Sequence, residues 1–84
     1  LLKANSLGLV DVPAARAAFT KACDMGHGTG CSRLGVMLTS GEGGPIDLAG
    51  ARKATVRACE DGSFGDCLTA ARMFELGEGG PQDL

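Results

Sequence analysis

Four cysteines are the residues of this 84-residue chain best suited to chemistry. They form two pairs with the same spacing, seven residues between the members of each: Cys23 with Cys31, and Cys59 with Cys67. Thiols spaced in this way can form disulfides, bind a metal ion or act as nucleophiles. Which of these roles applies depends on the elements that position them.

Those elements follow an internal repeat. Overlaying residues 11–48 on residues 47–84, a shift of 36 positions, gives 16 identities in 38 positions without a gap. The cysteine pairs superpose, and the longest identical block places Gly41–Pro45 on Gly77–Pro81. An internal period of this length is typical of helical repeat arrays.

The repeat predicts the organisation of the chain. We expect the first unit to span residues 10–45 and the second to span residues 46–81. Residues 1–9 are interpreted as the end of a preceding degenerate repeat or a cap, and residues 82–84 as the start of a further repeat. The chain begins with Leu1, so it is interpreted as a piece of a longer protein.

The first half of each unit has the pattern of an amphipathic helix. Small or apolar residues recur at i, i+3, i+4 and i+7, which places them on one helix face. These residues are Ala15, Ala18, Phe19 and Ala22 in the first unit, and Ala51, Ala54, Thr55 and Ala58 in the second. Asp11 and Asp47 stand at N-cap positions, and Pro13 fits a first turn. Gly26 and Gly62 are expected to end these helices in a left-handed conformation.

The second half of each unit predicts another helix, over about residues 29–40 and 65–76. Its buried face is expected to hold Leu34, Val36 or Met37, and Leu38 in the first unit, and Ala70, Met73 and Phe74 in the second. Ser63 with Asp66 three residues on resembles a capping box. Gly35 stands where a small residue lets two helices pack closely.

This arrangement favours disulfides over a metal site. One cysteine of each pair falls in the last turn of the first helix and the other in the first turn of the second, where antiparallel helices bring Cα atoms to about 5–6 Å. Pairing within units, Cys23–Cys31 and Cys59–Cys67, keeps the two copies equivalent. Zinc sites use closer cysteine pairs, and His27 has no counterpart in the second unit. Disulfides indicate an oxidising compartment, so we expect a periplasmic or secreted protein.

Composition excludes several functions. The formal net charge is −2, and the charges of both signs are interspersed. A basic footprint for nucleic acid or for a membrane surface is therefore lacking. No apolar run approaches the roughly 20 residues of a membrane span, so no membrane insertion is expected. We also expect no cofactor and no metal ion.

The pattern Ala-x6-Ala-Cys-x2-Gly-x4-Cys-x2-Leu-Gly-x5-Gly-x-Gly, from Ala15 to Gly43, resembles a Sel1-like repeat. The Cys-x7-Cys clip in a 36-residue period is similar to the cysteine-rich Sel1-like proteins of bacteria, such as the Helicobacter cysteine-rich proteins. The second unit departs from this pattern with Ala70–Ala71 in place of Leu34–Gly35. The resemblance implies an all-α, right-handed superhelical solenoid related to tetratricopeptide arrays, which serves as a binding scaffold.

The expected function is a non-catalytic scaffold that binds a protein or peptide partner. Arg16, Arg52 and Lys53 are placed on the polar side of the first helices, as a basic ladder for an acidic segment or as a solvated face. An alternative implied by the resemblance is a β-lactamase-named or penicillin-binding repeat protein, although no serine here is followed by lysine at the third position. A further alternative is an assembly or maturation factor in an oxidising organelle space.

Overall fold

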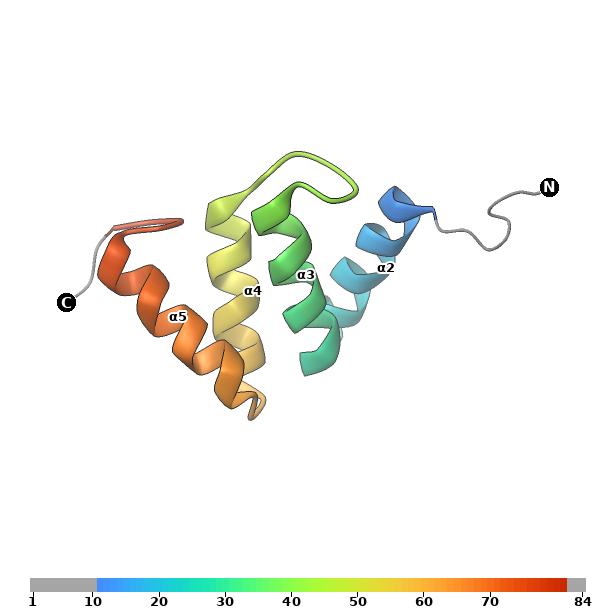
Figure 1. Cartoon of the computed structure of the whole chain (residues 1–84). Helices are drawn as coiled ribbons and strands as arrows, with labels where there is room; N and C mark the ends of the chain where they lie inside the picture. Colours follow the sequence, from blue (N-terminus) through green and yellow to red (C-terminus); the bar gives the residue numbers. More distant parts are fainter. Residues whose placement is uncertain (1–10, 82–84) are drawn as a thin grey trace.

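Four α-helices of 13 residues each form the described part of the chain, residues 11–81 of the computed structural model (Figure 1). They are α2 (Val12–Asp24), α3 (Gly28–Ser40), α4 (Leu48–Glu60) and α5 (Phe64–Leu76). Helices α4 and α5 begin 36 residues after α2 and α3, the period found in the sequence. The segments interpreted as a preceding repeat end and as the start of a further repeat, residues 1–9 and 82–84, lie outside the described residues.

The first helix of each unit begins at the expected aspartate. The Asp11 carboxylate accepts a hydrogen bond from the backbone N–H of Ala14 at 3.1 Å, and the Asp47 carboxylate accepts one from Gly50 at 2.9 Å. Each cap satisfies a backbone donor that the helix leaves unpaired, and a cap of this kind contributes about 1 kcal/mol. Pro13 lies in the first turn of α2, where its missing N–H costs nothing.

The turn within each unit is closed by a glycine. Gly26 and Gly62 have φ of +88° and +100°, the left-handed conformation expected of them. Helices α3 and α5 begin one residue earlier than the sequence pattern indicated. The capping box expected at Ser63 does not form, because its hydroxyl donates to the Asp66 carboxylate at 2.6 Å and makes no bond to the helix backbone.

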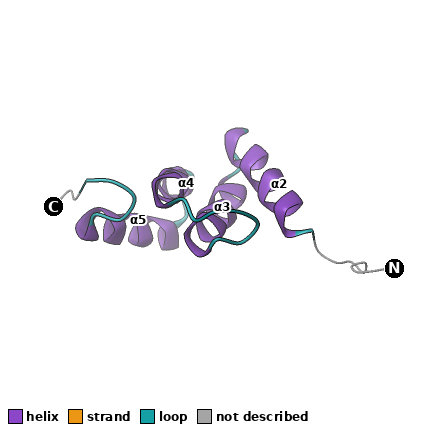
Figure 2. Ribbon diagram, turned by 90° about the horizontal axis from the view of Figure 1, so that it is seen from above, coloured by secondary structure: helices purple, strands orange, loops and turns teal. Residues whose placement is uncertain are grey.

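The helices pack in sequence order, so that α2 contacts α3, α3 contacts α4 and α4 contacts α5 (Figures 1 and 2). Small side chains of α4 form the centre of the core, with Ala51 and Ala58 fully buried. The equivalent residues of α2, Ala15 and Ala22, are only half-buried. Because α4 packs closely against two helices, α3 and α5, whereas α2 packs closely only against α3 among the described helices, the same pattern buries less surface in the first unit.

The close approach of α3 to α4 depends on Gly35. A Cβ at this position would lie 2.9 Å from the Thr55 hydroxyl oxygen, which is fixed by its bond to the Ala51 carbonyl at 2.7 Å. On the inner face of α3, Leu34, Met37 and Leu38 are buried as expected. Val36, the other residue considered for this face, is 58% exposed, which leaves Met37 as the core residue.

Candidate binding groove beside α4

The four cysteines form two disulfides, Cys23–Cys31 between α2 and α3, and Cys59–Cys67 between α4 and α5. These are the pairs that equivalence of the two units indicates. Their Cα atoms are 4.4 and 4.5 Å apart, at the short end of the usual range. Since all four thiols are bonded, none is available as a nucleophile or as a metal ligand.

A repeated arginine holds the glycine-rich loop of each unit. In the first unit, the Arg16 guanidinium donates to the backbone carbonyl oxygens of Glu42 at 3.2 Å and Pro45 at 2.6 Å. A guanidinium can serve both carbonyls because its N–H donors diverge in a rigid plane. The side chain of helix α2 thereby fixes a loop that follows α3.

The second unit repeats this arrangement. Arg52 donates to the carbonyl oxygens of Glu78 at 3.3 Å and Pro81 at 2.9 Å. Gly79 allows the loop to come this close, because a Cβ there would overlap the Leu48 carbonyl oxygen. We refer to the Arg16 and Arg52 arrangements as the arginine clamps.

The clamps correct one expectation. Arg52 was placed on the polar side of its helix, but it is only 9% exposed and its donors face backbone carbonyls. Arg16 is half-buried and bonded in the same way. Only Lys53 is exposed as expected. The helical period located these arginines on their helices but did not reveal the loop that folds back over them.

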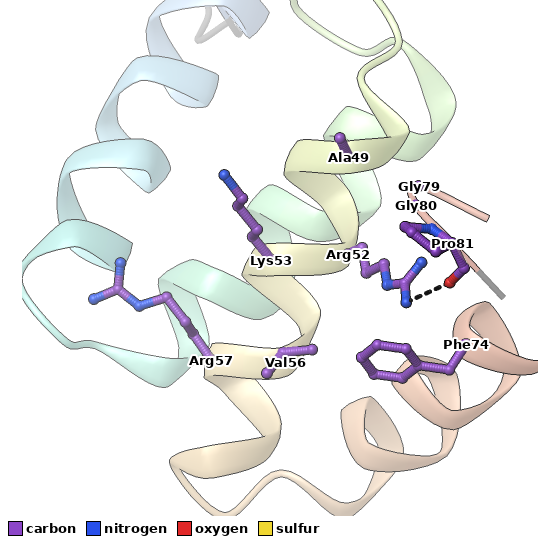
Figure 3. A pocket seen from close by; sticks show the side chains of 9 residues that line it. All are labelled: Ala49, Arg52, Lys53, Val56, Arg57, Phe74, Gly79, Gly80 and Pro81. Atoms are coloured by element: carbon purple, nitrogen blue, oxygen red, sulfur yellow. Dashed lines mark hydrogen bonds between the residues drawn. The ribbon is translucent and has the colours of Figure 1, made fainter. Parts of the chain in front are cut away.

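Phe74 completes the clamp of the second unit. Its ring centre lies 4.0 Å from the guanidinium carbon of Arg52, a cation–π geometry (Figure 3). Phe74 was expected in the core, yet it is half-buried. Its equivalent in the first unit, Leu38, is buried under α4. No described helix covers Phe74 in the way that α4 covers Leu38, so its ring forms part of an open wall.

A pocket of about 490 Å³ lies in front of this wall. Its floor is apolar: Val56 points from α4 toward Phe74, with Ala49 above and Pro81 on the far side (Figure 3). Its volume falls within the range of small-ligand sites. We call this space the α4 pocket.

The charges around the α4 pocket have one sign. Arg52, Lys53 and Arg57 line it, and no carboxylate occurs among the described residues that do so. Lys53 and Arg57 extend from α4 toward the α2 side, whereas Arg52 lies beside Phe74 (Figure 3). Arg57 also contacts the Asp24 carboxylate at 3.8 Å, but both side chains are exposed and such pairs contribute little. An occupant of the pocket therefore meets apolar surface bordered by positive charge.

Two of the three basic residues singled out from the sequence, Arg52 and Lys53, line the α4 pocket, and Arg16 does not. Val56, Arg57, Phe74 and Pro81 were not anticipated as lining residues. Part of this set of lining residues could have been predicted from the sequence, because Ala49, Lys53 and Val56 follow an i, i+4, i+7 spacing on one face of α4. Nothing local connects them to Pro81, which reaches the pocket only through the loop.

Among residues 11–81, the other groups capable of chemistry do not converge. His27 is exposed at the start of α3 and makes no capping bond. Ser32 and Ser63 both donate to the Asp66 carboxylate, which joins the second helices of the two units. Within residues 11–81, no three His, Cys, Asp or Glu side chains are placed to hold a metal ion.

None of the described helices is both long and apolar enough to cross a membrane. The two disulfides indicate an oxidising compartment. In comparisons with known proteins, no family model matches the chain and no curated protein matches it.

Proposed function

We propose that the chain is a Sel1-like repeat segment of a right-handed superhelical scaffold, which binds a protein segment without catalysis. Two helix pairs of equal length, each with a capping aspartate, a disulfide and an arginine clamp at a 36-residue interval, support this assignment. Repeat arrays present successive units along an extended surface, and such surfaces bind partners. The disulfides support a periplasmic or secreted location for the scaffold.

The α4 pocket is the observation that carries the binding function. An apolar floor bordered by Arg52, Lys53 and Arg57 suits a segment with an apolar side chain next to carboxylates. The apolar group would occupy the space between Val56 and Phe74. A neighbouring carboxylate would then lie along the exposed face of α4, within reach of Lys53.

This placement assigns different roles to the basic residues. Lys53 is exposed and is proposed to contact the partner directly. Arg52 forms one wall of the pocket while its donors hold the loop that forms the opposite wall. Arg16 is proposed to stabilise its own loop. A direct contact between Arg16 and the partner, as in a basic ladder, would be secondary to this role.

The test is a calorimetric titration with two peptides that share an apolar residue and differ in flanking residues, one acidic and one neutral. We expect the acidic peptide to bind more tightly, and this preference to shrink as salt screens the exposed charges. Lys53→Glu should weaken binding of the acidic peptide by about tenfold, which corresponds to ~1.4 kcal/mol. Lys21→Glu, an exposed lysine of α2 outside the pocket, is the matched control.

A second substitution tests the apolar floor. Val56→Asp should abolish binding of both peptides, whereas Val36→Asp, on the exposed face of α3, should leave binding unchanged. Equal affinity for the two peptides, together with unchanged binding in the Lys53 and Val56 variants, would contradict the assignment of the pocket.

A further inference from the structure

One ion pair joins the two units where α2 and α4 lie side by side. The Arg57 guanidinium of α4 is 3.8 Å from the Asp24 carboxylate of α2, and Figure 3 shows Arg57 extending toward the α2 side. Lys53, the other exposed cation that lines the α4 pocket, has no ion-pair partner among the described residues. The two exposed cations of the pocket therefore differ, because only Arg57 faces a carboxylate of the neighbouring unit.

The repeat preserves the charges of this pair. Lys21 of the first unit corresponds to Arg57 of the second, and Asp24 corresponds to Glu60. The residue type changes at both places, whereas the sign of the charge does not. Each unit thus carries a cation and, three residues later, an anion, and the anion of the first unit contacts the cation of the second.

The anion stands at an unfavourable place for its own helix. Asp24 is the last residue of α2, and Glu60 is the last residue of α4. The C-terminal end of a helix carries a partial negative charge, which disfavours a carboxylate there. The exposed ion pair with Arg57 also adds little to stability. Helix stability therefore does not explain the carboxylate, and its effect on the charges that a partner meets becomes the relevant one.

The three cations of the α4 pocket are not equally available to a partner. The donors of Arg52 are engaged by the loop carbonyls of Glu78 and Pro81. The charge of Arg57 is offset by Asp24. Lys53 is left as the exposed cation without a neighbouring carboxylate among the described residues.

We propose that Asp24 is a specificity-determining residue, which limits the partner to one carboxylate next to its apolar side chain. A first carboxylate pairs with Lys53. A second carboxylate, placed near Arg57, is attracted by the guanidinium and repelled by Asp24, so it gains little. This inference rests on the proposed binding function and adds to it the charge of the preferred partner.

The test is a calorimetric titration of the full chain with two peptides that share one apolar residue and carry either one or two flanking carboxylates. We expect the second carboxylate to strengthen binding to the parent chain by less than about twofold. In Asp24→Asn the same carboxylate should strengthen binding by about fivefold, because Arg57 is no longer offset. Asp24→Glu should behave as the parent, since it keeps the charge and introduces the residue type found at the equivalent Glu60.

Two further variants show whether the effect passes through Arg57. Asp24→Asn/Arg57→Gln should lose the fivefold gain, because the guanidinium that attracts the second carboxylate is absent. Glu42→Gln removes an exposed carboxylate outside the α4 pocket and changes the net charge by the same amount as Asp24→Asn. It should keep the parental ratio of the two affinities. An equal gain in Glu42→Gln and Asp24→Asn would overturn the proposal in favour of a general effect of net charge.

Failure of this inference and failure of the proposed function give different results. Equal gains from the second carboxylate in the parent and in Asp24→Asn, with binding still weakened by Lys53→Glu and Val56→Asp, would overturn the role of Asp24 alone. Binding that is unaffected by Lys53→Glu and Val56→Asp would overturn the proposed function and this inference with it.

Discussion

The guanidinium carbon of Arg52 lies 4.0 Å from the centre of the Phe74 ring, so that one side chain holds the loop and supports the aromatic wall of the α4 pocket. The Nη2 atom of Arg52 meanwhile donates to the Pro81 carbonyl at 2.9 Å. Stability of the second unit and the shape of its pocket thus depend on the same residue. Substitutions at Arg52 and at its neighbours are therefore expected to differ in their effects on stability and on peptide binding.

Arg52→Ala should lower the free energy of unfolding by about 1–3 kcal/mol, because two loop carbonyls lose their donor and the ring loses its cation. Arg52→Lys should recover little, since an ammonium group lacks the planar fork that reaches both carbonyls. Urea denaturation monitored by circular dichroism measures both. Lys53→Ala, one residue along on the exposed face, is the control and should stay within about 0.5 kcal/mol of the parent. Equal effects at the two positions would contradict the clamp.

Phe74→Leu introduces the residue that occupies the equivalent position, Leu38, in the first unit. Stability should fall by about 0.5–1 kcal/mol, because the cation–π contact with Arg52 is lost. The free energy of peptide binding should weaken by more than the free energy of unfolding falls, because the ring forms a wall of the α4 pocket. Calorimetric titration alongside denaturation distinguishes the two losses. A change in stability with unaltered peptide binding would separate Phe74 from the proposed site.

Removing either disulfide should lower the free energy of unfolding by roughly 2.5–3 kcal/mol in the chain-entropy model, because each closes a loop of similar length. The double variants Cys23→Ser/Cys31→Ser and Cys59→Ser/Cys67→Ser should behave alike in denaturation experiments. Thiol counting on unreduced protein in denaturant is the accompanying measurement. Four reactive thiols in protein made under oxidising conditions would contradict both bonds.

Two helical glycines should respond oppositely to alanine. Gly65→Ala should raise the free energy of unfolding by about 0.5–1 kcal/mol, because alanine favours helix and nothing lies within 4 Å of the added Cβ. Gly35→Ala should lower it by about 1–3 kcal/mol, because the Cβ would press against the bonded Thr55 hydroxyl. Thermal and urea denaturation of the two variants give the sign of each change in the free energy of unfolding. Stabilisation by both substitutions would show that α3 and α4 do not approach as closely as the structure has them.

Much of the local structure was determined by the sequence alone. The 36-residue period gave two helices per unit, and α3 and α5 begin within one residue of the expected positions. The caps at Asp11 and Asp47 followed from residue type and place, because a cap depends on atoms three residues away. The cysteine pairs followed from the repeat, since equivalence of the units leaves one pairing.

The tertiary structure decided which members of a repeated pattern are buried and what they contact. Ala51 is fully buried and Ala15 is not, although both have the same place in the pattern, because burial depends on how many helices surround the residue. The partners of Arg52 lie 26 and 29 residues away, so helical periodicity assigned it to the solvent face and missed the loop. Periodicity specifies the direction of a side chain around its own helix, whereas the α4 pocket exists only where a returning loop meets that helix.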